Sequence, residues 1–490
     1  MSTPFNLSRA LARITRPAVR GSMTALALIA GIGAAVADDA VLGEVLVTAQ
    51  KRSENVQDVP SSVSVFGGEQ LERLNAKSLV DYAAYLPGFN INSGGTPGQT
   101  TIVLRGVAPV GPGSVVGTYI DDTPLGSSSN YARATIYALD LLPDDIERVE
   151  VLRGPQGTLY GAGAMGGLLK YALRNPDLEQ FSARVGGETF DIQGAGDMGW
   201  GARASLNAPL VTDKLGVRFS GFTQTTAAYS DNAFTGREDI NEVEQTGGRA
   251  ALLWQATDNF SVKLGGLWQR TKGDNNNYTT LELTGIDPPT GQPTLGEATA
   301  FHPLDEPFRK DLDFYSLTLN WDVGGGSFVS ATSYSDTQTV SLQDASQIFG
   351  SLYSLLTGGL VPDGNNAFTL GLDLEKWTQE LRFASVQGER FEWLVGAFYT
   401  EEKSGNRQES VAFDVNNAPI AIFAPFFAFA ELPTDYQEIA LFGDATFKFS
   451  AAFDVTVGLR WAENEQEFRQ ISGGAILPTA DVPAVPRKTS

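Results

Sequence analysis

Few residues of this 490-residue chain have the chemistry to make or break covalent bonds. There is no cysteine, and the only histidine, His302, stands directly before Pro303. A thiolate nucleophile, a thiolate metal site, a zinc site built from several histidines and a His-based triad are therefore excluded. The G-x-S-x-G motif of serine hydrolases is also absent. We expect no catalytic residue, no metal site and no cofactor.

Two further patterns suggest chemistry but have plainer explanations. Gly161 to Gly166 matches the dinucleotide fingerprint G-x-G-x-x-G, yet no repeated βαβ units follow and Asn175-Pro176 ends the segment early. Asp121 and Asp122 are adjacent, and consecutive strand residues point to opposite faces, so a carboxylate pair for acid–base catalysis is not expected. We expect a turn or a solvated position for these two residues.

The charge balance and the first residues indicate the compartment. Lys and Arg number 35 against 57 Asp and Glu, a net charge of −22, which argues against a nucleic-acid partner. Four arginines without any acid precede the apolar run Met23–Ile32, and the small residues Ala35-Val36-Ala37 follow. This pattern predicts a cleaved secretory signal over residues 1–37. No later apolar stretch reaches the length of a membrane helix, so strands must form any membrane span.

The chain changes character near residues 176–181. All seven tryptophans follow that point, and period-two alternation begins there, as in Ile439 to Phe447. Short joins alternate with long ones, which favours a transmembrane barrel with short periplasmic turns over a soluble all-β protein. Long outward loops are expected at 227–244, 271–311, 339–374 and 402–434. The predicted strands are 181–190, 200–210, 215–226, 245–256, 260–270, 312–323, 327–338, 375–386, 391–401, 435–449 and 453–463.

Three segments before residue 176 have more specific patterns. The first is a β-prone strip suited to adding a strand to a partner's sheet edge, and it consists of Glu44, Val45, Leu46, Val47, Thr48 and Ala49. The second covers 101–107 and 119–125, with Arg105, Gly106 and Asp121. The third runs from 146 to 161, with Glu147, Arg148, Glu150, Arg153, Gly154, Gly157, Tyr160 and Gly161.

The third segment combines charges with glycines. Its charged residues that lie two apart share a strand face, so they can pair with adjacent strands or a surrounding wall. The alternative is an ordinary solvated face. Its glycines supply turns and close backbone approaches.

These three segments, in this order, resemble the plug domain of TonB-dependent outer-membrane receptors, and the first resembles their TonB box. The likeness runs from about Glu44 to Pro176 and continues more loosely to Trp461. The chain departs from the common pattern where Ala162–Met165 replaces an Arg-Asn pair. The resemblance implies a membrane all-β barrel, antiparallel and 22-stranded in the family with about 11 strands present here, and an N-terminal α+β plug domain in the lumen.

The resemblance also implies a domain order. We expect a signal peptide at 1–37, a leader with the TonB box at 38–52, a plug domain at 53–176, and the N-terminal half of a truncated barrel at 177–490. Half a barrel has two open edges, whose unpaired backbone groups are costly in hydrocarbon, so we expect further strands in the full-length protein.

The implied function is TonB-dependent active import of a scarce bulky solute across the outer membrane of a Gram-negative bacterium, without enzymatic activity. The implied partners are TonB with its inner-membrane energising complex, outer-membrane lipid and lipopolysaccharide, and a small-molecule solute. The full-length protein is expected to be a monomer. A ferric siderophore is the first candidate solute, and a carbohydrate, a vitamin or another nutrient are alternatives. The residues that bind the solute stay open.

Two other functions fit the sequence less well. A signalling transducer resembles this family but carries an extra periplasmic domain before the TonB box, whereas only Asp38 to Gly43 intervene here. A passive porin would lack both the plug segments and the box.

Overall fold

The computed structural model describes residues 46–59, 61–74, 76, 78–93, 98–107, 115–127, 129, 141, 145–276, 298–450, 453–483 and 486–489. These residues belong to one compact unit, Val45–Ser490. The predicted signal peptide, and Glu44 and Val45 of the TonB-box strip, lie outside the described residues.

The N-terminal part of this unit is a small α+β domain. Its five-stranded sheet has the order β3-β8-β9-β6-β7. Central strand β9 is buried along its whole length, which explains its nearly continuous apolar sequence. Two of the domain's three short helices, at 68–73 and 79–83, form one core with the sheet and the β4–β5 hairpin, whereas the third, at 157–160, contributes Tyr160 to a second small core. The elements are β3 (Ser62–Gly67), α1 (Gly68–Arg73), α2 (Leu79–Ala83), β4 (Phe89–Ser93), β5 (Thr100–Leu104), β6 (Val116–Ile120), β7 (Thr123–Pro124), β8 (Ile146–Arg153), α3 (Gly157–Tyr160), the 3₁₀ turn η3 (Ala162–Ala164) and β9 (Gly167–Leu173).

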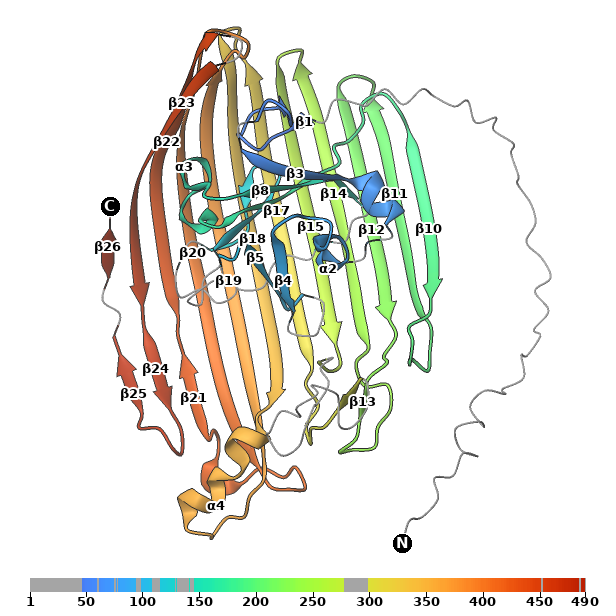
Figure 1. The fold of residues 1–490 in the computed structure, drawn as a ribbon, viewed down its shortest axis with the longest axis vertical. Coiled ribbons are helices and arrows are strands. Elements are labelled where there is room, and N and C mark those ends of the chain that lie inside the picture. The colour runs from blue at the N-terminus through green and yellow to red at the C-terminus, as the bar shows by residue number, and fades with distance from the viewer. Residues whose placement is uncertain are drawn as a thin grey trace, which may run out of the picture. The chain divides into compact units, whose positions relative to one another are not determined.

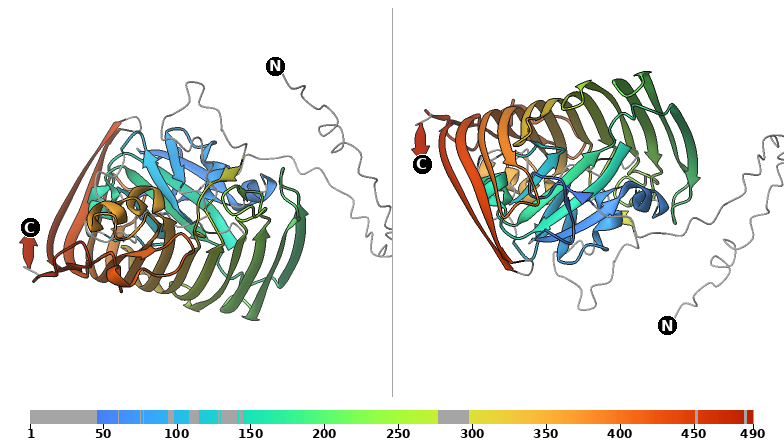
Figure 2. Two further views of the ribbon diagram at one scale, coloured as in Figure 1. Left: turned by 90° about the horizontal axis from the view of Figure 1, so that it is seen from below. Right: turned by 90° about the horizontal axis from the view of Figure 1, so that it is seen from above.

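The remaining residues form one large antiparallel sheet that curves around the N-terminal domain (Figure 2). Its long strands lie where the sequence predicted them. They are β10 (Ser182–Phe190), β11 (Gly199–Val211), β12 (Leu215–Thr226), β14 (Val243–Thr257), β15 (Phe260–Gly273), β17 (Phe308–Asp322), β18 (Gly326–Asp344), β19 (Asn365–Ser385), β20 (Phe391–Phe413), β22 (Thr434–Ser450) and β23 (Phe453–Phe468). Within the described residues, the end strands β10 and β23 do not pair with each other. We call this sheet the barrel wall and the N-terminal domain the plug.

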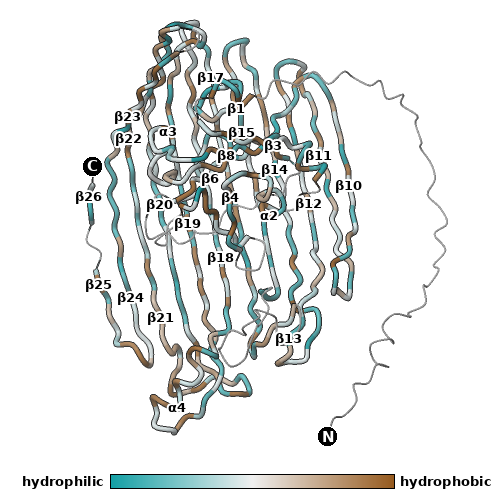
Figure 3. Tube along the Cα trace, in the orientation of Figure 1, coloured by the Kyte–Doolittle hydropathy of each residue, from teal (hydrophilic) through white to brown (hydrophobic). Residues whose placement is uncertain are grey.

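The barrel wall has the reverse polarity of a soluble sheet. On β19, Lys376, Glu380 and Arg382 are buried against the plug side, whereas Trp377 and Leu381 between them are exposed on the outer face. Figure 3 shows hydrophilic and hydrophobic residues interspersed along the long strands. Charged residues inside and apolar residues outside are the pattern of a barrel in lipid.

The two ends of the wall differ. One end has the short turns, and the other has the longer connections with the helix α4 (Leu352–Thr357) and the strand β13 (Asp231–Asn232) (Figure 1). The longer connections contain the smaller elements β16 (Thr299–Ala300), η4 (Ser346–Gly350), η5 (Ala421–Phe423), β21 (Ala428–Glu431), β24 (Gln470–Gly473) and β25 (Ala480–Val482), and β26 (Arg487–Thr489) pairs with β23.

The predicted loop bounds 339–374 and 402–434 were too wide. Strand β18 continues to Asp344, β19 begins at Asn365, and β20 continues to Phe413. The reason is visible in Leu370, Leu372 and Leu374, which alternate with more polar residues and bury one face of this extension. The predicted loop 271–311 includes residues 277–297, which lie outside the described part. Among the described residues, no helix is long and apolar enough to cross a membrane.

Candidate functional site: the leader and the contacts between plug and wall

The described part of the TonB-box strip is folded against the plug. Leu46–Val47 (β1) pairs antiparallel with Glu54–Asn55 (β2), and β1 lies toward the end of the wall that has the short turns (Figure 1). Val47 and Ala49 are buried in a small core with plug residues that include Leu152 and Leu168, whereas Leu46 is 49% exposed.

Hydrogen bonds from the plug hold the next two residues of the strip. The backbone N–H of Thr48 donates to Glu150 Oε1 over 3.1 Å, and the Thr48 hydroxyl donates to the same oxygen. The Tyr160 hydroxyl donates to the carbonyl oxygen of Ala49 over 2.8 Å, and Lys170 Nζ donates to that of Thr48 over 3.4 Å. Since these bonds occupy backbone groups that a strand ladder would use, the strip must leave the plug before it can pair with another sheet along Thr48 and Ala49.

Lys51 closes a tight turn that begins at Thr48, and its side chain contacts the barrel wall. Its N–H donates to the Thr48 carbonyl over 3.0 Å, and its backbone has a φ of 60°. The Lys51 ammonium forms an ion pair with Glu380 of β19 and lies 5.0 Å from the ring centroids of both Tyr160 and Phe442. Burial lowers the pKa of Lys51 to about 8, although the Glu380 carboxylate opposes the shift.

The adjacent carboxylates of Asp121 and Asp122 occupy the tight turn between β6 and β7. Asp121 pairs with Lys263 of β15 over 3.0 Å, and Asp122 pairs with Arg382 of β19 over 2.9 Å and with Lys170 over 3.5 Å. The prediction of a turn, with the two side chains pointing apart, is confirmed. Of the two expected alternatives, a turn or a solvated position, the structure shows the turn, and this turn faces the barrel wall. Burial alone would raise the pKa of Asp122, but the charges of Arg382 and Lys170 hold it well below the usual value.

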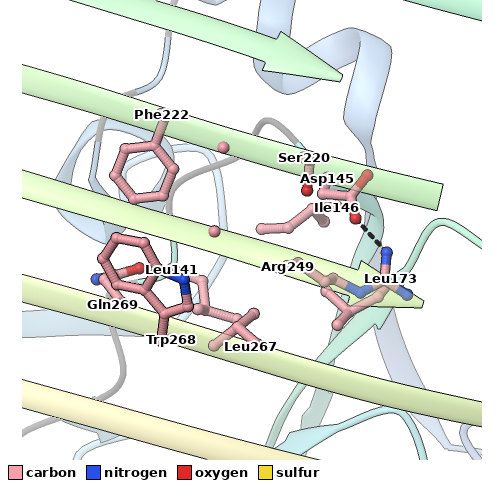
Figure 4. Close-up of a pocket in the computed structure, with 12 residues that line it drawn as sticks. Leu141, Asp145, Ile146, Leu173, Ser220, Phe222, Arg249, Leu267, Trp268 and Gln269 are labelled. Atoms are coloured by element: carbon pink, nitrogen blue, oxygen red, sulfur yellow. Dashed lines mark hydrogen bonds and ion pairs between the residues drawn. The ribbon is translucent and has the colours of Figure 1, made fainter. Parts of the chain in front are cut away.

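A third carboxylate of the plug, Asp145, lies between two arginines of the wall. Arg218 Nε of β12 donates to Asp145 Oδ1 over 2.6 Å, and Arg249 of β14 donates to the other oxygen. Arg249 also donates to the backbone carbonyl of Arg174 over 2.8 Å. Figure 4 shows the Asp145 and Arg249 side chains pointing toward each other beside a small apolar cavity lined by Leu141, Ile146 and Leu173.

The charged residues of the third sequence segment make contacts within the plug and with the leader. Arg148 pairs with Glu150 over 2.8 Å and with the half-exposed Glu147 over 2.7 Å. Arg153 donates to the carbonyl oxygen of Pro87 over 3.0 Å. In the contacts that the structure describes, the partners of these side chains come from neighbouring plug residues and Thr48 rather than from the barrel wall.

The remaining residues of the predicted signatures shape the plug backbone. Gly106, Gly154 and Gly161 have φ values of 76°, 96° and 82°, a region that favours glycine. Arg105 also has a positive φ, 51°, and its N–H donates to the carbonyl of Gly88 over 2.8 Å. Gly157 is the first residue of α3, and Tyr160 is the last.

The sequence analysis did not assign a role to five residues that connect plug, leader and wall: Lys51, Asp145, Lys170, Glu380 and Arg382. It considered Asp122 only as a member of an acidic pair. One signal for the wall residues was present, because Glu380 and Arg382 share a strand face with Lys376 while Trp377 and Leu381 occupy the opposite face. Charges on one face and apolar side chains on the other indicate an inward polar surface.

Known proteins resemble both parts of this unit. Residues 55–168 match the model of the TonB-dependent receptor plug domain. The ferrioxamine B receptor of Salmonella typhimurium is 28% identical over 209 residues, which cover 42% of this chain and 27% of that receptor. The pesticin receptor of Yersinia pestis is 35% identical over 135 residues, or 27% of this chain and 19% of that receptor. These alignments span less than a third of the relatives' own lengths.

Solved structures share the fold of plug and wall together. The ferric yersiniabactin uptake receptor FyuA from Yersinia pestis has a TM-score of 0.68 at 18% identity, covering 88% of this chain and 60% of that one. The ferric-catecholate import receptor Fiu from E. coli K12 has a TM-score of 0.63 at 16% identity, covering 91% and 68%. Residues 55–168 therefore match the plug domain of TonB-dependent receptors, and the plug inside an outward-apolar barrel wall has the fold of the solved receptors.

Proposed function

We propose that this chain serves TonB-dependent active import of a bulky, scarce solute across the outer membrane of a Gram-negative bacterium. The solute binds at the end with the long connections, and TonB takes hold of Glu44–Ala49 at the end with the short turns. Energy from the inner membrane then moves the plug. No covalent chemistry is required of the chain, and the full-length protein works as a monomer in lipid and lipopolysaccharide.

The observation that carries this proposal is the placement of the strip Val47–Ala49. It is a β-prone segment held by the plug through hydrogen bonds to Glu150 and from Tyr160. It lies near the short turns, since Gln387 of the β19–β20 turn donates to Glu54 of β2 over 3.2 Å. A segment with this chemistry and this location is suited to capture by strand addition from the periplasm.

The domain scheme follows from the same proposal. Residues 1–37 act as the export signal, 38–52 as the leader, 53–176 as the plug and 177–490 as barrel strands. The buried charges of the wall and the exposed side chains between them support insertion in lipid, because an outward apolar face would be costly in water.

A ferric siderophore is the first solute to test. The matched relatives include a ferrioxamine B receptor, hemin receptors and a vitamin B12 transporter, so a panel of ferrioxamine B, hemin, a ferric catecholate and vitamin B12 covers the main classes. A carbohydrate is the alternative outside this panel. Thermal stabilisation of the whole receptor by one compound would identify the class, because a ligand that binds only the folded state raises its stability.

Val47→Pro tests the role of the strip. Proline lacks the backbone N–H and cannot join a strand ladder, so we expect loss of uptake of the identified solute while outer-membrane insertion and solute binding remain. Val47→Ala is the matched control, because it removes the same side chain but keeps the N–H and should retain uptake. Uptake at the wild-type rate by Val47→Pro would show that the partner grips another segment.

An accessibility experiment tests the orientation. An impermeant label applied to intact cells should reach single cysteines in 345–364 and 414–433 and spare those in the turns 257–259 and 387–390. Because the native chain has no cysteine, each label reports one position. Preferential labelling of the turns would invert the proposed topology.

A further inference from the structure

Lys51 is a buried cation of the leader inserted between plug and wall. It is 4% exposed, forms its ion pair with Glu380 of β19, and lies between the rings of Tyr160 and Phe442. Only Gln50 separates it from the strip Val47–Ala49 that the plug holds by hydrogen bonds. Movement of the strip out of the plug therefore pulls directly on this ammonium group.

The surrounding carboxylates do not depend on Lys51 for a counter-ion. Glu380 also pairs with Arg382 over 3.1 Å through its other oxygen. Asp122 pairs with Arg382 and Lys170, and Glu150 pairs with Arg148. If Lys51 leaves, each of these three carboxylates keeps a cationic partner. The usual penalty for breaking a buried pair, an uncompensated charge left behind, is therefore small at this site.

Two features make the buried position of Lys51 unfavourable. A lysine ammonium is strongly hydrated in water, and burial lowers its pKa to about 8 despite Glu380. Its φ of 60° also lies in the left-handed region, which is strained for a residue with a Cβ. Both costs disappear when the leader becomes extended in water. A cavity of about 390 Å³ adjoins Lys51 and is lined by Arg52 and Arg382 together with Gly324 and Gln387 of the short turns.

We propose that Lys51 keeps the leader releasable: its burial opposes the hydrogen bonds of Thr48 and Ala49, so the strip leaves readily while the plug stays paired to the wall. This inference rests on the proposed function only in taking Glu44–Ala49 as the segment that a partner grips. It predicts the opposite of a simple salt-bridge anchor. A neutral side chain of similar length at position 51 should hold the leader more tightly.

Methionine is the suitable replacement. It is unbranched like lysine, and its thioether packs well between aromatic rings. With methionine at position 51, Glu380 still has its ion pair with Arg382. We would place a single cysteine at Leu46, which is half-exposed, attach a nitroxide spin label, and reconstitute the whole receptor in lipid vesicles. The spectrum separates a mobile population, with the leader released, from an immobile one. For Lys51→Met at pH 7 we expect the ratio of mobile to immobile label to fall about tenfold.

Two variants control the assay. Lys263→Met removes another cation between plug and wall, the partner of Asp121, and should leave the label at position 46 unchanged. Glu380→Gln removes the carboxylate beside Lys51 and should increase the mobile population, which verifies that the label detects release. If Lys51→Met makes the label more mobile, Lys51 is an anchor and the proposal is overturned.

The pH dependence of the wild-type label is an independent test, because it does not require the Lys51→Met variant to fold well. The pKa of Lys51 in the released leader is ordinary and lies above the pKa of the buried group. Between these two pKa values the released state binds more protons. Raising the pH in this range therefore favours the state in which the leader is bound to the plug. The wild-type mobile population should fall about tenfold or more from pH 7 to pH 9.5. The groups facing Lys51 are Glu380 and Arg382 of β19, Asp122, Lys170 and Tyr160, while β22 presents the Phe442 ring.

The response of Lys51→Met isolates the group responsible. A pH response that persists in this variant comes from one of the other groups and overturns the assignment to Lys51. A wild-type label whose mobility is constant or rises with pH also overturns it. Failure of the proposed function looks different: the label would behave as expected, but purified periplasmic TonB domain would not increase the release.

Discussion

Two of the contacts with the barrel wall, one from the plug and one from the leader, have opposite arrangements of charge. At Asp145, the plug contributes a carboxylate and the wall contributes Arg218 and Arg249. At Lys51, the leader contributes a cation and the wall contributes Glu380, next to the pair between Arg382 and plug residue Asp122. The two sites therefore differ in what remains after one partner is removed.

This difference gives the two contacts different roles: the Asp145 contact holds the plug, and the Lys51 contact permits release of the leader. Without its carboxylate, the Asp145 site would keep two buried guanidinium groups of like charge, which cannot lose their protons. Without Lys51, the other site keeps every carboxylate paired. The first site is suited to seat the plug permanently, and the second is suited to let the leader go. The predictions below test this contrast, beginning with the largest expected effect.

Asp145→Asn should weaken the seating of the plug most. The substitution keeps the shape of the side chain but leaves Arg218 and Arg249 without a counter-ion, and breaking a buried pair in this way costs about 3–5 kcal/mol. We expect a lower melting temperature and faster proteolysis of the plug in the whole receptor. The control is Asp481→Asn, which breaks a solvent-screened, half-exposed pair with Arg469 and should leave the melting temperature nearly unchanged. Equal melting of the two variants would contradict the assignment of Asp145 as the main anchor.

Arg382→Met should have an intermediate effect on the stability of the receptor. It should also reverse the effect that Lys51→Met has on release of the leader. Glu380 would then depend on Lys51, and Asp122 on Lys170, so we expect a loss of about 2–3 kcal/mol. In this background Lys51→Met leaves Glu380 unpaired and should release the leader instead of tightening it. The spin label at position 46 measures the change in sign. A coupling below about 0.5 kcal/mol between the two substitutions would show that Arg382 is not what makes Lys51 dispensable.

These tests depend on residues that sequence patterns predict unequally well. Period-two alternation located the long strands because it reflects which face each side chain occupies, a local property of the chain. The same alternation was present at Leu370, Leu372 and Leu374, but the predicted strand 375–386 began too late to include them. The alternation of side chains along a strand argued against a catalytic pair at Asp121 and Asp122, and of the two expected alternatives the turn is present.

The side-chain pairs that join the plug and leader to the barrel wall could not be predicted from the sequence, for a physical reason. Lys51 and Glu380 are separated by 329 positions, and their contact requires both the register of β19 and the insertion of the plug. Neither is encoded by local propensity. The resemblance to the family directed attention to Glu44–Ala49 and to the charged strand at 146–153, while the partner of that strand, Thr48, could not be inferred from spacing.

Gly161→Ala should have a smaller effect, confined to the neighbourhood of the leader. Gly161 has a φ of 82°, and an added Cβ would lie 3.4 Å from the guanidinium of Arg460 on β23. With a ψ of −173°, this backbone lies in a region that only glycine adopts readily, and it costs an alanine about 1–3 kcal/mol. We expect a modest fall in plug stability and a small rise in label mobility, because α3 carries Tyr160. Gly126→Ala is the control, since its Cβ would meet no atom within 4 Å and its φ is not positive. If both variants melt alike, backbone strain at Gly161 is not significant.

Tyr160→Phe should have the smallest effect and should separate the two sites most cleanly. The substitution removes the hydroxyl that donates to the Ala49 carbonyl over 2.8 Å, a bond worth about 1 kcal/mol. It keeps the ring, which packs edge-on against Tyr119 at 5.0 Å and stacks beside Lys51, and it keeps the backbone carbonyl that accepts from the Tyr119 hydroxyl.

Because only the leader loses a bond, the ratio of mobile to immobile label at position 46 should rise about fivefold while the melting temperature of the plug stays within error of the wild type. Tyr119→Phe is the matched control: it removes a hydroxyl bonded within the plug, so it should leave the label unchanged. A Tyr160→Phe receptor with an unchanged label would mean that Glu150 and Lys170 suffice to hold the strip. One that melted as early as Asp145→Asn would mean that leader and plug are released together, and the distinction between a holding and a releasing contact would fail.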